Sequence, residues 1–225
     1  MKFHKPKILG IVNITEDSFS DGGLYLDYGK ALEKSLKLVE DGASIIDLGA
    51  ASSNPSSKEV KPQEEIDRLK PVADYLLTKN IPVSIDSFKS TVQQYFLNRN
   101  VQYLNDIQGF SHPEIYPEIA KSDCKLIVMH SVQRFGPATV IETKPEKVFN
   151  EIIDFFSQRI KSIQNSGISS DRIILDPGMG FFLGSNPESS IHVLKNISQL
   201  KGYFNLPILI SVSRKSFLGA IVGRE

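Results

Sequence analysis

Short runs of apolar residues alternate with longer stretches of helical periodicity along almost the whole chain of 225 residues. Each apolar run is rich in β-branched residues and is bounded by turn residues, which is typical of a buried strand. The expected strands are residues 7–12, 43–48, 81–86, 101–106, 124–130, 172–176 and 206–212. The expected helices are residues 28–42, 62–80, 89–100, 113–123, 145–167 and 186–202. Prolines at helix starts, and Gly42, Gly167 and Gly202 at helix ends, mark several boundaries.

Strands buried on both faces that alternate with helices predict a parallel sheet. Seven such units in a row favour a (β/α)8 TIM barrel over a doubly wound sheet, and no G-x-G-x-x-G motif follows the first run. A helix is expected to begin at residue 213, and the sequence stops at Glu225. A closed barrel needs about 30 more residues, the length of one further β-α-β step. We therefore expect residues 1–225 to form a single barrel domain, truncated at its C-terminus, with the eighth strand and last helix absent.

The composition narrows the choice of partners and compartment. Lys and Arg total 26, as do Asp and Glu, so no overall basic field attracts nucleic acid. The single cysteine, Cys124, excludes an internal disulfide and fits a reducing compartment. The N-terminal apolar run is too short for a signal peptide, and no segment has the roughly 18 apolar residues that a membrane span requires. We expect a cytoplasmic protein with no membrane or nucleic-acid partner.

Polar residues follow every expected strand, and in a barrel the active site lies at this end of the strands. Helix capping is the alternative explanation, because Asp, Asn and Ser are favoured caps. It does not suit the residues that lie well before the next helix, and a site for a polar small molecule is favoured. Carboxylates, an amide and a lysine together can bind a flat heterocycle with many donors and acceptors. The residues are Asn13, Asp47, Asp86, Asn105, Asp106, His130, Asp176, Ser213, Arg214 and Lys215.

Residues 172–186, RIILDPGMGFFLGSN, combine the features of such a site. A buried strand ends on Asp176, and glycines that let the backbone approach a ligand come next. Two aromatic residues, Phe181 and Phe182, then follow and can form a wall beside a ring. The four histidines give no metal cluster, and His130 either lines the site or is structural.

Seven motifs, in order, resemble those of the dihydropteroate synthases of the folate pathway. They are ILGIVNITEDSFSDGG (8–23), DLGAASSNP (47–55), SIDSF (84–88), LNDIQGF (104–110), VMHSVQ (128–133), ILDPGMGFF (174–182) and SVSRKSFLG (211–219). The resemblance implies a transferase that joins 6-hydroxymethyl-7,8-dihydropterin pyrophosphate to p-aminobenzoate and releases pyrophosphate. It also implies Mg²⁺ as cofactor and a homodimer.

The resemblance assigns roles position by position. Asp176 and Lys215 would be catalytic, and the negative charge of Asp176 would stabilise the cationic pterin once pyrophosphate departs. The pterin would contact Asp86, Asn105, Met129, Asp176 and Lys215. Asn13, Ser53 and Asn54 would bind pyrophosphate, and Asn13 would also meet Mg²⁺. The aminobenzoate pocket would be formed by Ser53, Pro55, Phe181, Phe182 and Ser213.

The sequence departs from the usual family pattern in three places. Asn54 stands where the family has an arginine, so one charge-assisted phosphate contact is missing. The stretch after Gly180 has a second phenylalanine and no lysine, which specifically resembles the mobile, sulfonamide-insensitive members. We predict that Phe182 narrows the aminobenzoate pocket so that bulkier sulfonamides clash, with simple packing under the loop as the alternative. The family's final Arg-x-His strand has no counterpart.

Two other functions stay open at this point. A catalytically inactive, truncated pterin-binding module would bind ligand without turnover. A pterin-dependent methyltransferase shares the barrel but needs a corrinoid partner, and the motif from Asn13 to Gly23 together with residues 213–215 argues against it.

Overall fold

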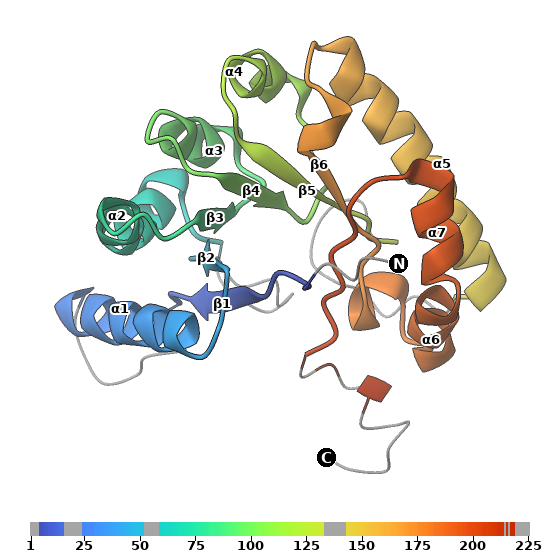
Figure 1. Cartoon of the computed structure of the whole chain (residues 1–225), viewed down its shortest axis with the longest axis horizontal. Helices are drawn as coiled ribbons and strands as arrows, with labels where there is room; N and C mark the ends of the chain where they lie inside the picture. The colour runs from blue at the N-terminus through green and yellow to red at the C-terminus, as the bar shows by residue number, and fades with distance from the viewer. Residues whose placement is uncertain are drawn as a thin grey trace. The chain divides into compact units, whose positions relative to one another are not determined.

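The computed structural model describes residues 5–15, 24–51, 59–132 and 143–213, with 215, 217 and 218. The chain divides into two compact units. The first contains residues 1–52, 57–105 and 122–124, and the second contains residues 53–56, 106–121 and 125–225. Figure 1 gives the element labels used below.

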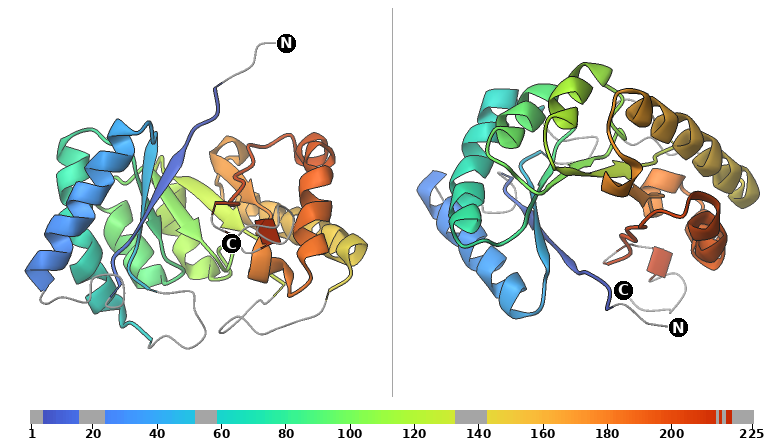
Figure 2. Two further views of the ribbon diagram at one scale, coloured as in Figure 1. Left: turned by 90° about the horizontal axis from the view of Figure 1, so that it is seen from below. Right: turned by 45° about the horizontal axis from the view of Figure 1, so that its top comes forward.

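The first unit is built on parallel strands that follow one another in chain order. They are β1 (Leu9–Asn13), β2 (Ile45–Gly49), β3 (Val83–Asp86) and β4 (Tyr103–Asp106). The helices between them are α1 (Leu24–Glu40), α2 (Pro62–Thr78) and α3 (Ser90–Leu97). Figure 2 shows these three helices along the same outer side of their strands.

The register of the first unit aligns its polar strand ends. Asn13 pairs with Gly49, Gly49 with Asp86, and Asp86 with Asn105, so these four residues form one row across the strands. Side chains two residues apart on a strand point to the same face. Asp47 and Ser84, which also pair with each other, therefore lie on the same face as this row and one layer below it.

Helix α2 illustrates why the helices form where they do. Pro62 occupies the first turn, where a missing backbone N–H costs nothing. Buried residues then recur at helical spacing, including Ile66, Leu69, Val72 and Leu76, so one face packs inward. Burying each such side chain contributes roughly 1.5–3 kcal/mol. Helix formation and packing against the strands therefore favour the same conformation.

The second unit contains strands β5 (Lys125–Met129) and β6 (Ile173–Asp176), which pair in parallel. Its helices are α4 (Tyr116–Ala120), α5 (Pro145–Asn165), α6 (Pro187–Lys195) and α7 (Ile197–Phe204). Short 3₁₀ turns are η2 (Pro113–Ile115), η3 (Ser170–Arg172) and η4 (Gly180–Leu183). Strand again alternates with helix, as the sequence pattern predicts.

Two expectations from the sequence were wrong in detail. Residues 206–212 form no regular strand, only an isolated bridge between Leu175 and Ile208. Pro207 has no N–H to extend that ladder. The helix expected over 186–202 is interrupted at Asn196, whose side chain donates to the His192 carbonyl at 2.8 Å. Gly202 lies inside α7, which ends instead at Phe204, with Asn205 as its C-cap.

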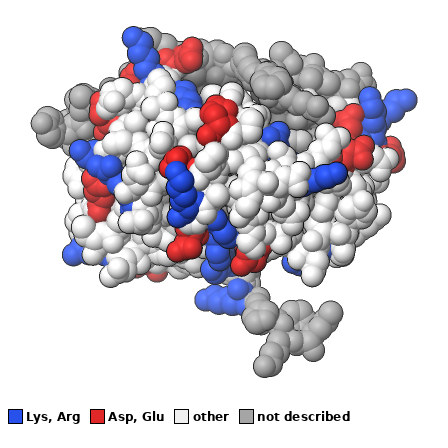
Figure 3. Space-filling model, turned by 90° about the horizontal axis from the view of Figure 1, so that it is seen from above, with Lys and Arg blue, Asp and Glu red and all other residues white. Residues whose placement is uncertain are grey.

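The charge distribution agrees with the balanced composition. On the face drawn in Figure 3, basic side chains are interspersed with acidic ones. Within the described ranges, the helices are too short or too polar to cross a membrane.

Candidate active site

Asn13 and Asp86 converge over Gly49 at the strand ends of the first unit. A Cβ atom added to Gly49 would lie 3.3 Å from Asn13 Oδ1 and 3.4 Å from Asp86 Oδ2. The absent side chain at Gly49 therefore leaves the two oxygens facing a common space. The sequence-predicted residues Asn13, Asp86 and Asn105 are thus brought into one row.

A buried polar cluster lies at and just below this row. Asn105 Nδ2 donates to Asp47 Oδ2 at 3.1 Å, and both side chains are buried, as is Ser84. Burial raises the pKa of Asp47, and the side chains of Ser84 and Asn105 oppose this shift. Asn105 Oδ1, Asp47 Oδ1 and Ser84 Oγ have no hydrogen-bond partner among the described residues. Several buried oxygens in this cluster therefore keep unused bonding capacity.

The turn that follows Asp86 is held by hydrogen bonds. The backbone N–H of Ser87 donates to the Asn105 carbonyl at 3.0 Å. The buried Gln93 side chain donates to the Ser87 carbonyl at 2.7 Å, and the Lys89 N–H donates to Ser87 Oγ at 3.3 Å. These contacts hold the backbone directly after Asp86.

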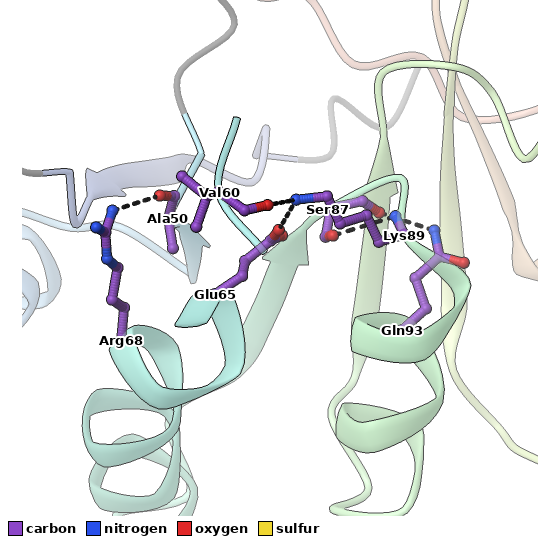
Figure 4. A network of polar contacts seen from close by, with 7 residues as sticks. All are labelled: Ala50, Val60, Glu65, Arg68, Ser87, Lys89 and Gln93. Carbon is purple, nitrogen blue, oxygen red and sulfur yellow. Dashed lines mark hydrogen bonds and ion pairs between the residues drawn. The ribbon is translucent and has the colours of Figure 1, made fainter. Parts of the chain in front are cut away.

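Two cations hold the ends of the β2–α2 connection, as Figure 4 shows. Arg68 donates to the Ala50 carbonyl at 3.3 Å, where the chain leaves β2. Lys89 donates to the Val60 carbonyl, just before α2, and pairs with Glu65 at 2.8 Å. Glu65 is 1% exposed and the Lys89 side chain 13%, so the pair is shielded from water.

In the second unit, the backbone fixes Asp176 at the end of β6. The Gly178 N–H donates to Asp176 Oδ1 at 2.8 Å, and the His130 N–H donates to the Asp176 carbonyl at 2.8 Å. Gly178 has φ 75°, and a Cβ there would overlap the His130 carbonyl oxygen. Only glycine fits this turn without strain.

Lys215 lies close to both Asp176 and Phe182. Burial lowers the pKa of Lys215, while the charge of Asp176 opposes the shift. Lys215 Nζ is 4.9 Å from the centre of the Phe182 ring, within the range of a cation–π contact. The two phenylalanines differ, since Phe181 is 65% exposed and Phe182 is half-buried.

The remaining predicted residues have different outcomes. Met129 is buried and pairs in register with Asp176, whereas Ser213 is exposed in a turn. The positions assigned to pyrophosphate and aminobenzoate on the second loop, Ser53, Asn54 and Pro55, lie outside the described residues.

One of the polar strand ends takes part in a local turn and not in a helix cap. Asp106 Oδ1 accepts the N–H of Gln108 at 2.7 Å, so this carboxylate closes its own turn. His130 packs edge-on against Phe155, with ring centroids 5.3 Å apart. In the described part of the chain, no group of three or more acidic, histidine or cysteine side chains is placed to hold a metal ion.

Comparison with known proteins identifies the family. The sequence profile of the pterin-binding enzymes matches residues 9–225, so the chain belongs to that family. Dihydropteroate synthase type-3 from Escherichia coli is 60% identical over 219 residues, which cover 97% of this chain and 83% of that protein. The chain is therefore a member of the dihydropteroate synthases, the transferases of folate biosynthesis that its motifs indicate.

Solved structures confirm the barrel class. Xanthomonas albilineans dihydropteroate synthase with 4-aminobenzoic acid has a TM-score of 0.86 and is 31% identical, covering 98% of this chain and 78% of that one. The Anaplasma phagocytophilum enzyme with bound 6-hydroxymethylpterin-monophosphate has a TM-score of 0.83 and is 36% identical, covering 96% and 82%. The expected (β/α)8 fold class is thus correct.

Proposed function

We propose that the chain condenses 6-hydroxymethyl-7,8-dihydropterin pyrophosphate with p-aminobenzoate, giving 7,8-dihydropteroate and pyrophosphate. The observation that carries the proposal is the row of Asn13, Asp86 and Asn105 over the bare backbone of Gly49. A methyltransferase reaction is the second candidate, and a requirement for a corrinoid protein would distinguish it.

Each pterin contact is proposed residue by residue. Asp86 and Asn105 supply acceptors from the first unit. Met129 packs on the ring, while Asp176 binds its amino and ring N–H groups and Lys215 its carbonyl side. When the bond to pyrophosphate breaks, positive charge develops on the pterin, and the fixed carboxylate of Asp176 stabilises it. Because backbone contacts hold that carboxylate, little reorganisation accompanies the reaction.

Pyrophosphate and Mg²⁺ are assigned to Asn13, Ser53 and Asn54. Mg²⁺ in phosphate sites commonly takes only one or two protein ligands, with water and phosphate oxygens completing its shell. The Oδ1 atom of Asn13, facing the space above Gly49, fits that requirement. Bound there, the ion would neutralise charge on the leaving pyrophosphate. Either other groups compensate for the missing arginine, or Asn54 contributes a weaker hydrogen bond to the phosphate.

The aminobenzoate pocket is assigned to Ser53, Pro55, Phe181, Phe182 and Ser213. Phe182 is the half-buried member of the aromatic pair, and its ring centre lies 4.9 Å from Lys215 Nζ. A ring fixed there admits the flat aminobenzoate and clashes with the larger sulfonyl group of a sulfonamide. Such rejection by clash need not weaken substrate binding. We therefore propose that the enzyme is insensitive to sulfonamides.

The decisive experiment measures dihydropteroate formation by these 225 residues, with Mg²⁺ or EDTA, and with or without a sulfonamide. Mg²⁺-dependent turnover that persists with the drug is expected. Phe182→Gly should become sensitive to the drug, while Phe181→Gly, at the exposed position, should change less. Pterin binding without turnover would instead identify an inactive binding module.

Assembly and location follow from the same assignment. The family profile runs through both units without interruption, from residue 9 to 225, which supports one pterin-binding domain. We further propose a homodimer that acts in the cytoplasm. Light scattering on the purified protein tests the dimer.

A further inference from the structure

Asp47 is a buried carboxylate for which the proposed reaction has no role. It lies on the inner layer of the first unit, paired in register with Ser84 and 2% exposed. Its Oδ2 atom accepts from Asn105 Nδ2, one layer above. Burying a carboxylate is costly, so its position beneath a residue assigned to the pterin requires an explanation.

We propose that Asp47 is a positioning residue that sets the orientation of the Asn105 amide, so that Asn105 Oδ1 faces the pterin as an acceptor. The inference rests on the proposed function, because it takes Asn105 to be a pterin ligand. The ligand groups recognised would be the amino or ring N–H donors of an aminopyrimidine.

The direction of the Asp47–Asn105 hydrogen bond shows how Asp47 would orient the amide. An amide has a donor end and an acceptor end of nearly the same shape, and either can be turned toward a neighbour. An ionised carboxylate only accepts. A reversed Asn105 amide would place its oxygen against Asp47 Oδ2, so the carboxylate selects the orientation with Nδ2 inward.

The Oδ1 atom of Asn105 is the acceptor that a pterin N–H would need. Asn105 is 9% exposed, and its Oδ1 atom has no partner among the described residues. Buried acceptors are almost always satisfied by protein, water or ligand. A pterin N–H would supply the missing donor, and a reversed amide would instead present N–H groups to the donors of the pterin.

The test uses Asp47→Asn, which keeps the shape of the side chain and removes the fixed acceptor. The amide at position 47 can then donate or accept, so both orientations of Asn105 become available. We expect the Kd for 6-hydroxymethylpterin, measured by calorimetry, to rise about tenfold, the size of one charge-assisted hydrogen bond. The KM for dihydropterin pyrophosphate should rise in parallel, with the KM for p-aminobenzoate unchanged.

A double-mutant cycle separates positioning from a general structural role. If Asp47 acts through Asn105, Asp47→Asn should have no further effect on the Kd in an Asn105→Ala background. Glu65→Gln is the matched control, since it removes another buried carboxylate of the same unit and should leave this Kd unchanged.

Two results would overturn the inference. One is wild-type affinity for 6-hydroxymethylpterin in Asp47→Asn, and the other is an equal effect of that substitution with and without Asn105. Failure of the proposed function would look different, because the wild-type chain itself would then bind no pterin or form no dihydropteroate.

Discussion

The strand ends of the two units hold their polar groups by different means. In the first unit, side chains contact one another, as in the Asn105–Asp47 hydrogen bond at the strand ends and the Glu65–Lys89 ion pair at the starts of α2 and α3. In the second, backbone N–H groups and a glycine turn fix Asp176. The first arrangement should therefore be sensitive to substitutions that keep shape and change polarity. The second should be sensitive to any added side chain.

The largest effect is expected where a buried charge loses its partner. Lys89→Met leaves the Glu65 carboxylate buried and unpaired, which should destabilise the protein by about 3–5 kcal/mol. It also releases the Val60 carbonyl, so the KM for p-aminobenzoate should rise. Urea unfolding and steady-state kinetics measure the two effects.

Lys37→Met is the matched control for that substitution. Lys37 pairs with Glu40 on the surface, with side chains 61% and 73% exposed, and removing it should leave the stability almost unchanged. Equal losses of stability in Lys89→Met and Lys37→Met would show that the buried Glu65–Lys89 pair stabilises the protein no more than a surface pair does.

The second unit is best probed by adding a single methyl group. Gly178→Ala introduces a Cβ that overlaps the His130 carbonyl at a left-handed φ of 75°, and should cost about 1–3 kcal/mol. Turnover should also fall, because the Asp176 carboxylate moves with the turn. Gly202→Ala, in helix α7 with nothing within 4 Å of the new Cβ, should instead be neutral or stabilising. Similar stabilities and activities for the two variants would contradict a backbone-fixed Asp176.

The pH dependence of stability should reveal Asp47 in the first unit. Its folded-state pKa is raised above 3.8, so the folded protein binds protons more tightly than the unfolded chain. Stability should therefore fall as the pH rises from the unfolded pKa through the folded one. Urea unfolding at a series of pH values upward from 3.8 should show a shallower fall for Asp47→Asn than for the wild type.

Lys215 in the second unit should change the pH dependence of stability in the opposite direction. Its folded-state pKa is lowered below 10.5, so the unfolded chain binds protons more tightly. Its contribution to stability should rise with pH through the window between the folded pKa and 10.5. Lys215→Met should flatten that rise in unfolding curves at alkaline pH. This effect is expected to be the smallest, since Lys215 is only partly buried.

Periodicity was sufficient to predict most of the fold. The helix expected over residues 145–167 is observed as Pro145–Asn165, because its apolar spacing and its packing favour the same element. The bridge at Ile208 and the interruption at Asn196 depend on where backbone groups find partners, and periodicity does not report this.

The candidate site was predictable in its residue types but not in its contacts. The sequence alone indicates that polar residues follow the strands. The turn that Asp106 closes is known only from its hydrogen bond with the Gln108 N–H in the structure. Glu65 and Lys89 are separated by 24 positions, and nothing local to either residue indicates a pair. A glutamate in the first turn of a helix is ordinarily explained by the helix dipole.

The η4 turn has an evolutionary consequence. It lies between Gly178 and Gly184, which both have positive φ, and it carries both phenylalanines. Residues between these two glycines can be substituted while the carboxylate of Asp176, which precedes them, keeps its position. Under the proposed assignment of Phe181 and Phe182 to the aminobenzoate pocket, a substitution in this short segment would change which amine is admitted and leave Asp176 unchanged.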